Sequence, residues 1–233
     1  NAKIYNKYYG IKHISLNNLK KSIYGLTEIN KKNLSKGKII ACPGCYPTSI
    51  LLPLFPLIKK NLIDFKNIVI DSKSGFSGAG RGVHKKFKNK NLYGSTSAYG
   101  IGSHRHNAEI QQELSYIKKN IEFTFTPHIL PMFRGILSTI YLNYKSKANL
   151  NNIYNELRRY YMKEKFIKIL KNKALSTNDV INTNNCQISV CKSKDKKKLI
   201  ILSSIDNLIK GGAGQAVQNL NLIFNFKLNE GLK

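Results

Sequence analysis

Long apolar runs are absent from this 233-residue sequence. No stretch of roughly eighteen or more apolar residues occurs, which excludes a membrane-spanning helix of ordinary length. The N-terminal residues, NAKIY, also lack the order of a secretory signal. With 42% hydrophobic residues the chain is long enough to bury a substantial core. We therefore expect a globular, soluble, cytoplasmic protein that has no membrane partner.

Cysteine is scarce, with four residues in the chain, which is too few for a disulfide scaffold. Cys42 and Cys45 stand three apart in IACPGCYPTSI, and this spacing has three interpretations: half of a zinc site, a redox dithiol, or one nucleophile beside an unreactive thiol. A zinc site needs four ligands. The other cysteines, Cys186 and Cys191, lie about 140 residues away at a looser spacing. The zinc and dithiol interpretations are therefore weaker than the nucleophile.

Acidic residues are few: 12 stand against 39 basic residues, for a formal charge of +27. Such an excess suggests a polyanionic partner. However, only five of the basic residues are arginine, which nucleic-acid recognition favours for bidentate contacts. We expect salt-sensitive, nonspecific polyanion binding but no specific nucleic-acid function. The few arginines are expected where a planar guanidinium is needed, and Arg81, Arg105 and Arg134 fall in segments rich in Gly or His.

The apolar patterns predict an α/β fold with a largely antiparallel or mixed sheet. The expected strands cover residues 38–41, 67–71, 121–126, 136–145, 186–191 and 199–205. Helices are expected from about residue 48, in the second half of 103–114, over 149–163 and near the C-terminus. Pro53 and Pro56 should kink the first of these helices.

Cys45 lies where a predicted strand gives way to a predicted helix. The preceding Pro43-Gly44 permits a tight approach, and Pro47 is tolerated in a first helical turn. A helix N-terminus favours negative charge, so it should stabilise a thiolate. The pattern predicts a nucleophilic Cys45 and a packed Cys42.

The segment HRHNAE supplies candidates for proton transfer. In an extended HRH segment, His104 and His106 point to one side and Arg105 points to the other. Glu109, three residues after His106, is expected to meet that histidine across a helical turn. A metal site is the competing interpretation.

The segment SGFSGAGRG, residues 74–82, is rich in small residues. Its backbone N–H groups are suited to hold a phosphate or to let a planar ring approach. It matches neither common nucleotide-binding glycine pattern, so a simple flexible turn is the alternative.

Five motifs, ACPGCYPT, SGFSGAGRG, HRHNAEI, FTPHILPMFRGI and DNLIKGGAGQAVQN, occur in this order along the chain. Together they resemble the N-acetyl-gamma-glutamyl-phosphate reductase family, which is related to aspartate-semialdehyde dehydrogenase. The resemblance implies reduction of an acyl phosphate by NADPH to an aldehyde in arginine biosynthesis. It also implies a glyceraldehyde-3-phosphate dehydrogenase-like catalytic domain and a homodimer or homotetramer.

The resemblance also implies site roles. Cys45 would form a thioester that hydride reduces to a thiohemiacetal, with His106 or His104 as acid/base; Glu109 favours His106. Arg105 and Arg134 would bind the substrate's anionic groups, Arg81 would close the Gly/Ser loop, and no metal is implied. The residues implied near NADP(H) are Ser74, Gly75, Ser77, Gly78 and Asn207.

The resemblance divides the chain into three parts. Residues 1–41 correspond to the tail of a dinucleotide-binding domain, 42–205 to the catalytic and dimerisation domain, and 206–233 to a helix that returns to the first domain. The family's Gly-rich NADP fingerprint is not recognised here, so we expect a fragment or a truncated gene product. Many members also have Asn at Cys42 and Pro at Ala108. The alternatives are an aspartate-semialdehyde dehydrogenase-like enzyme and a Lys-rich zinc or nucleic-acid-binding protein.

Overall fold

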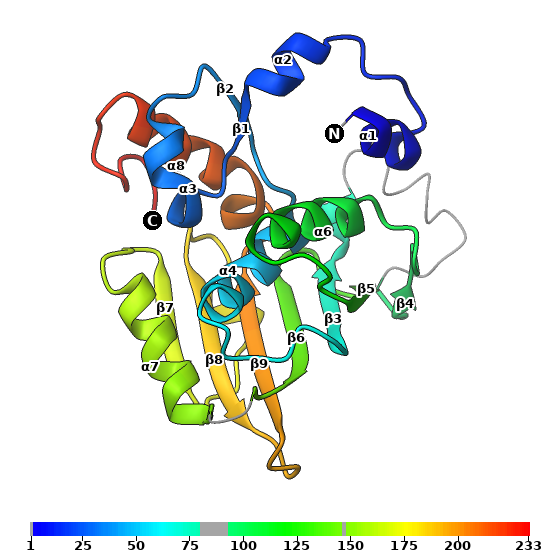
Figure 1. Ribbon diagram of the computed structural model, residues 1–233, viewed down its shortest axis with the longest axis vertical. Helices are drawn as coiled ribbons and strands as arrows, with labels where there is room; N and C mark the ends of the chain where they lie inside the picture. The colour runs from blue at the N-terminus through cyan, green and yellow to red at the C-terminus, as the bar shows by residue number, and fades with distance from the viewer. Residues whose placement is uncertain (1, 80–92, 146–147) are drawn as a thin grey trace.

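The computed structural model describes residues 2–79, 93–145 and 148–233. Two sheets organise these residues, a small parallel one and a larger mixed one (Figure 1). The small sheet pairs β1 (Ser22–Tyr24) with β2 (Ile39–Ala41). The large sheet has seven strands in the spatial order β4 (Ser97–Ala98), β5 (Phe123–Leu130), β3 (Ile68–Gly75), β6 (Ile136–Asn143), β9 (Lys198–Ile205), β8 (Cys186–Lys192) and β7 (Ile167–Lys171).

The large sheet is mixed, which confirms the predicted fold class. Strand β3 runs parallel to β5 and antiparallel to β6, and β8 runs parallel to β7. The other neighbours are antiparallel. Burial alternates along β6, as expected for a strand with one face against a core.

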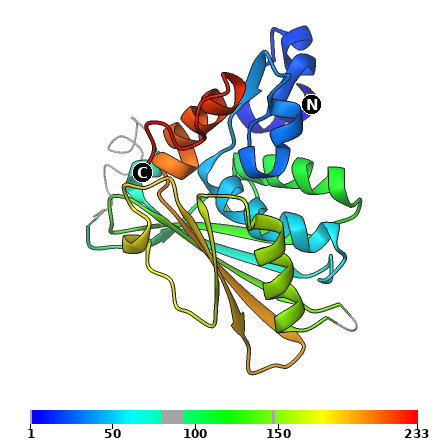
Figure 2. The same cartoon turned by 90° about the vertical axis from the view of Figure 1, so that its left-hand side faces the viewer.

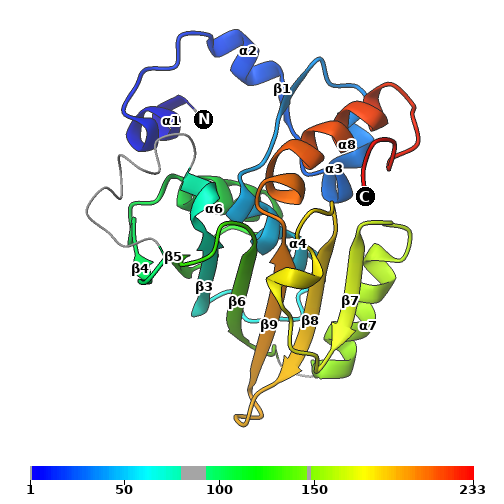
Figure 3. The same ribbon diagram turned by 180° about the vertical axis from the view of Figure 1, so that it is seen from behind.

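Three helices cover one face of this sheet: α4 (Cys45–Lys59), α6 (Arg105–Ile117) and α7 (Leu150–Tyr161) (Figures 2 and 3). A short 3₁₀ turn, η2 (Thr177–Asp179), lies on the other face, where the Ser204 hydroxyl donates to the Ser176 carbonyl at 3.3 Å. None of the described helices is both long and apolar enough to span a bilayer.

Helix α4 is continuous through Pro53 and Pro56, so these prolines do not end the helix. A proline leaves the carbonyl four residues earlier without its helical donor. For Pro56 that carbonyl belongs to Leu52, and the Tyr161 hydroxyl of α7 donates to it at 2.5 Å. A residue distant in sequence thus replaces the missing bond.

A chain of buried hydroxyls fixes α4 on the centre of the sheet. Ser138 of β6 bonds to Ser49 of α4 at 2.8 Å and to Ser72 of β3 at 2.7 Å. All three residues are fully buried. Hydrogen bonds therefore set the height and rotation of α4, in addition to its apolar packing.

The N-terminal and C-terminal segments pack on each other at one end of the molecule (Figure 1). The further helices there are α1 (Ala2–Tyr9), α2 (Leu16–Lys21), α3 (Thr27–Leu34) and α8 (Gly214–Ile223). A π-helical turn, η3 (Ile209–Ala213), precedes α8. The Thr27 hydroxyl donates to Asn219 of α8 at 2.7 Å.

Several element boundaries differ from the sequence-based expectations. Strand β3 continues to Gly75, beyond the expected end at residue 71, and is followed by the 3₁₀ turn η1 (Phe76–Ala79). Pairing with β5 and β6 on either side carries β3 into this Gly/Ser segment. The sequence also did not indicate β7, whose residues are half-buried or exposed without strict alternation.

The core packing of α4 generates a stability prediction. Leu57 is fully buried, whereas Leu220 on α8 is 47% exposed. We expect Leu57→Ala to lower the free energy of unfolding by about 2–5 kcal/mol, since it leaves a cavity. The matched change Leu220→Ala should cost less than about 1 kcal/mol. Urea denaturation measures both, and equal losses would contradict this packing.

Candidate active site

Cys45 is the first residue of α4, as the sequence predicted. Gly44 precedes it in extended conformation and caps the helix, and its carbonyl accepts the Thr48 amide at 3.0 Å. Gly211 of η3 closes the other side. A Cβ added at Gly211 would lie 2.6 Å from the Cys45 Cβ, so only glycine permits this approach.

Burial controls the charge of Cys45. Although the residue keeps some exposed area, protein atoms surround its sulfur and raise the pKa of the thiol to about 11. The amides of Cys45 and Tyr46 act in the opposite direction and lower that pKa. The expected effect of the helix start is thus present, but burial outweighs it. The resting group is a thiol, and the expectation of a thiolate is wrong for this state.

The HRH segment begins α6 and is not extended, contrary to the sequence-based expectation. His104 is the N-cap, and its Nδ1 accepts the His106 amide at 3.1 Å. Arg105 is already helical. The two imidazole centroids nevertheless lie 4.7 Å apart, so capping brings the histidines together.

His106 lies directly against the residue before Cys45. A Cβ added at Gly44 would overlap the His106 imidazole. His106 is 8% exposed, and its Nδ1 is buried with no hydrogen-bond partner among the described residues. Burial, followed by the neighbouring His104 and Arg105, lowers the pKa of His106 to about 3. The imidazole is therefore neutral at physiological pH.

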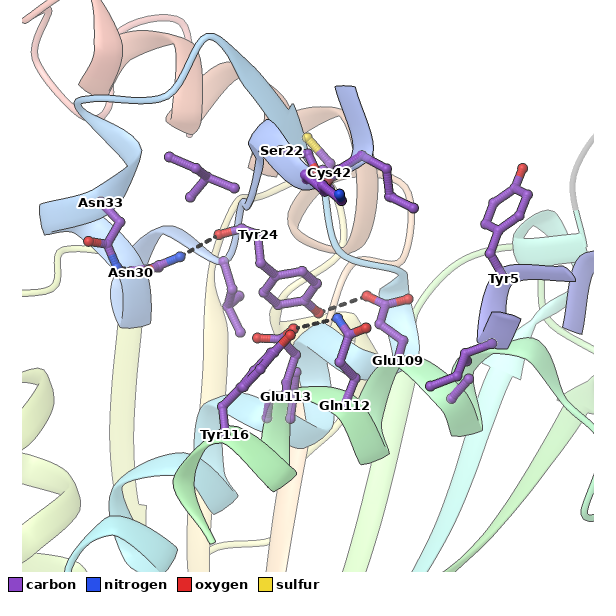
Figure 4. A pocket seen from close by; sticks show the side chains of 18 of the residues that line it. Tyr5, Ser22, Tyr24, Asn30, Asn33, Cys42, Glu109, Gln112, Glu113 and Tyr116 are labelled. Carbon is purple, nitrogen blue, oxygen red and sulfur yellow. Dashed lines mark hydrogen bonds between the residues drawn. The ribbon is translucent and has the colours of Figure 1, made fainter. Parts of the chain in front are cut away.

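Glu109 does not orient His106, so that expectation is wrong. Its Oε1 accepts the Tyr24 hydroxyl at 2.7 Å and the Gly44 amide at 2.9 Å (Figure 4). Burial raises the pKa of Glu109, while these two bonds and Arg105 lower it. The carboxylate holds the turn that carries Cys45 and ties it to β1.

Aromatic rings surround the histidines. The Tyr46 ring packs edge-on against His104 and His106, at centroid distances of 5.7 and 5.8 Å. The Tyr99 hydroxyl donates to the Tyr46 hydroxyl at 3.1 Å, and Tyr46 donates to the His128 carbonyl at 3.2 Å. These contacts fix Tyr46, which follows Cys45, against the two imidazoles.

Arg105 and Arg134, the two predicted anion-binding residues, differ in availability. Arg105 is exposed at the start of α6, with its guanidinium 5.9 Å from the Tyr9 ring centroid. Arg134 instead pairs with the fully buried Asp206 at 3.3 Å and donates to Asn182 at 2.5 Å. Arg81 lies outside the described residues, as does the rest of segment 80–92.

The expected cofactor residues divide into two groups. Ser74 and Gly75 are buried in the end of β3, and a Cβ at Gly75 would meet the Phe133 backbone at 2.5 Å. Ser77 and Gly78 are more accessible and lie beside Asn207. Asn207 donates to Ser77 at 3.0 Å and accepts the Gly135 amide at 2.6 Å.

A cavity with a volume of about 1200 Å³ lies between the N-terminal segment and α6 (Figure 4). Cys42, Arg105 and Glu109 line it, whereas Cys45 is not among its lining residues. The cavity therefore adjoins the turn before α4 but does not open onto the Cys45 thiol.

Sequence reasoning missed three residues of this site. Tyr24 lies in a segment for which no role was expected, and nothing local pairs it with Glu109. Gly44 was expected only to permit a tight approach, and Gly211 appeared only as part of a motif. The signal available for Gly211 was the motif KGGAG, which the structure places against Cys45.

The neutral His106 generates a pH prediction. In the unfolded chain a histidine has a pKa of about 6.5, whereas folding lowers the pKa of His106 to about 3. Between these values the unfolded state binds the extra proton, so the free energy of unfolding should fall as pH decreases. His106→Gln removes this contribution. From pH 6.5 to 4.5 the parent should lose about 2 kcal/mol more than the variant.

Chemical denaturation of the parent and of His106→Gln at each pH gives this difference. The contributions of the other titrating groups are the same in both proteins and cancel. A difference that stays constant across the range would contradict the buried, neutral imidazole.

Most of the chain matches a known protein family. Residues 45–207 match the family described as "Semialdehyde dehydrogenase, dimerisation domain". The match begins at Cys45 and ends at Asn207. Among the described residues, no three His, Cys, Asp or Glu side chains form a metal-binding group. The family match supports the reductase interpretation over the Lys-rich zinc or nucleic-acid-binding one.

Sequence relatives are named N-acetyl-gamma-glutamyl-phosphate reductase. The protein of Lachnoclostridium phytofermentans is 42% identical over 238 residues, which cover 100% of this chain and 68% of the relative. That of Campylobacter jejuni subsp. doylei is 44% identical over an alignment that covers 100% of this chain and 69% of the relative. The probable chloroplastic enzyme of Arabidopsis thaliana is 42% identical, with coverages of 98% and 57%.

Structural relatives share the fold at low identity. Aspartate semialdehyde dehydrogenase II from Vibrio cholerae superposes with a TM-score of 0.69 at 15% identity, covering 88% of this chain and 69% of that one. The Francisella tularensis enzyme gives 0.68 at 16% identity, with coverages of 88% and 71%. At this identity the likeness supports the fold alone, so the aspartate-semialdehyde alternative is the weaker one. The chain belongs to the N-acetyl-gamma-glutamyl-phosphate reductase family and carries a semialdehyde dehydrogenase dimerisation domain.

Proposed function

We propose that this chain performs the acyl-transfer chemistry of an NADP-dependent reductase, with N-acetyl-gamma-glutamyl phosphate as substrate and N-acetylglutamate 5-semialdehyde and phosphate as products. The family name supports the substrate. One observation supports the chemistry most: Cys45 begins α4 while His106 lies against the adjoining Gly44. A thiol and an imidazole around one turn are the parts that covalent acyl transfer requires.

In the first step, the Cys45 sulfur attacks the acyl carbon of the substrate. A sulfur–carbon bond forms, the bond from that carbon to the phosphate oxygen breaks, and phosphate leaves with the bonding electrons. The thiol proton passes to a base or to water. No redox change occurs in this step, so it needs no reductant.

The resting state must change before this attack. Burial raises the pKa of the Cys45 thiol to about 11 and lowers the pKa of the His106 imidazole to about 3, so both groups are neutral at rest. Substrate entry, by rehydrating the sulfur, would lower the pKa of the thiol and favour the thiolate.

We assign the acid/base role to His106. The His104 Nδ1 already accepts the His106 amide as the cap of α6. The His106 Nδ1 has no partner among the described residues, so a ligand proton or a water can pair with it. Glu109 supports this role indirectly, by fixing Gly44 against the ring.

We assign anion binding to Arg105. It is exposed at the N-terminus of α6, where the helix dipole also favours an anion. Arg134 is held by Asp206, so it would bind substrate only as part of that ion pair.

The residues near Asn207 fit a nicotinamide cofactor. Gly78 is exposed and has no side chain, and a Cβ there would lie 3.1 Å from the Ser74 hydroxyl and 3.4 Å from Asn207 Nδ2. A flat ring needs such a bare backbone and adjoining amide. Bound NADP(H) would supply the hydride that reduces the thioester. Ser77, Gly78 and Asn207 would hold it, with Ser74 and Gly75 shaping the backbone beneath.

We also infer the assembly and domain roles. The paired residues Val69 and Tyr141 are 42% and 43% exposed on the sheet face opposite α4. This face is where a second copy would bind, in agreement with the dimerisation domain that the chain matches. Residues 1–41 and 206–233, joined by α3 and α8, would form the part that adjoins the cofactor, and 42–205 the catalytic part.

Acyl transfer can be tested with the 233-residue chain, because this half-reaction needs no cofactor. The chain is mixed with N-acetyl-gamma-glutamyl phosphate, quenched in acid and analysed by mass spectrometry and phosphate assay. We expect one acyl group on Cys45 and an equal amount of released phosphate. Cys45→Ser should slow both by about a thousandfold or more, since the nucleophile is lost.

The matched variant is Cys42→Ser, which should retain acylation because Cys42 is exposed, contrary to the packed position expected, and precedes α4. β-Aspartyl phosphate serves as the comparison substrate, and faster acylation by it would favour the aspartate-semialdehyde alternative. Acylation that persists in Cys45→Ser, or its absence from the folded parent, would refute the proposal.

A further inference from the structure

Lys210 and Glu28 form a completely buried ion pair. The Lys210 ammonium lies 2.5 Å from Glu28 Oε1, and both side chains are 0% exposed. Coulombic attraction by Lys210 and its hydrogen bond lower the pKa of Glu28, although burial opposes them. The pair is therefore charged inside the protein, and the reaction described above does not use it.

The pair joins two segments that are distant in sequence. Glu28 belongs to α3, and Lys210 belongs to the π-helical turn η3 that precedes α8 (Figure 1). Gln218 of α8 completes the group: its Oε1 accepts from Lys210 at 2.7 Å, and its Nε2 donates to Glu28 at 2.8 Å. Asn184 donates to Gln218 at 2.9 Å.

This group is not needed as a tether between the N-terminal segment and the rest of the chain. The Thr27 hydroxyl and the Gly25 carbonyl already bond to Asn219. Lys31 of α3 also pairs with Glu164 at 2.6 Å. A buried ion pair adds little net stability, because desolvation offsets the attraction. Its presence therefore calls for a role other than attachment.

The residue after Lys210 touches the nucleophile. Gly211 packs so closely on Cys45 that an added Cβ would lie 2.6 Å from the Cys45 Cβ and 3.0 Å from its Cα. The Gly211 amide donates to the Asp206 carbonyl at 2.9 Å. The widened turn of η3 thus has two anchors: Asp206 at its start and the Lys210 side chain at its centre. π-Helical turns occur frequently at functional sites.

We propose that the buried Glu28–Lys210 pair positions the Gly211 backbone against Cys45 and so sets the environment of the thiol. Both are positioning residues, since neither contacts the reacting atoms. The inference rests on the proposed role of Cys45.

The action is mechanical and not a direct effect of charge. The charges of the pair offset each other, and the charged groups that influence the Cys45 thiol are Glu109 and Arg105. Loss of the Lys210 anchor should let Gly211 move away from Cys45 and admit water to the sulfur.

The test is the pH profile of Cys45 alkylation by iodoacetamide in the 233-residue chain. All variants also carry Cys42→Ser, so that Cys45 is the only cysteine in its segment and the extent of its alkylation can be measured by mass spectrometry of the peptide that contains it. The main variant is Glu28→Gln with Lys210→Met, which removes both charges together and leaves no unpaired buried ion. Glu28→Gln alone is the milder second variant. In parent background, burial holds the thiol pKa at about 11.

We expect the double variant to be alkylated about tenfold faster at pH 8, since rehydration that lowers the thiol pKa by about one unit multiplies the thiolate tenfold. Lys31→Met is the matched control, because it removes the other ion pair of α3 but does not adjoin η3. It should leave the profile unchanged.

An unchanged profile in the folded double variant would overturn the proposal. Failure of both Glu28 variants to fold would also overturn it, since it would assign the pair to stability alone. An effect of Lys31→Met as large as that of the double variant would count against it in the same way. Alkylation reports the thiol without substrate or cofactor, so this test can fail independently of the acyl-transfer proposal.

Discussion

The site depends on one half-buried carboxylate. Glu109 of α6 accepts the Gly44 amide and the Tyr24 hydroxyl with a single oxygen, and so joins the helix that carries His106, the turn that carries Cys45 and strand β1. Without these bonds, Gly44 has no fixed distance from the imidazole that it contacts. A carboxylate is suited to this task because a charged acceptor makes stronger hydrogen bonds than a neutral one.

Burial of the two reactive groups, Cys45 and His106, is the second property of the site. Burial keeps Cys45 a thiol and His106 a neutral imidazole, although a helix N-terminus by itself would favour the opposite charge on sulfur. Two glycines make this possible by allowing backbone to contact both groups. The structure thus describes a site in which both groups are neutral at rest. This arrangement limits adventitious oxidation or alkylation of Cys45, which proceeds through the thiolate.

Much of the architecture could be predicted from sequence because its signals are local. The position of Cys45 at a strand-to-helix turn, the mixed sheet and α7 all follow from apolar periodicity and from glycine and proline chemistry. What the sequence could not predict depends on residues that are distant along the chain. Helix α4 continues through Pro56, where Tyr161 donates to the carbonyl that the proline leaves without its helical donor. Glu109 was recognised as a site residue, but with His106 as partner, because the pairing with Tyr24 depends on tertiary structure. No local pattern indicates that Lys210 would be buried beside Glu28.

Amide hydrogen exchange at Gly44 tests the central claim most directly. In the parent chain this amide should exchange as slowly as the amides within α4, because the Glu109 carboxylate holds it. Glu109→Ala should accelerate its exchange about tenfold or more while the central amides of α4 stay protected, since one hydrogen bond is lost but the helix is retained. Glu109→Gln, which keeps an oxygen acceptor, should fall between the two. Rapid exchange at Gly44 in the folded parent, or unchanged exchange in Glu109→Ala, would contradict the account.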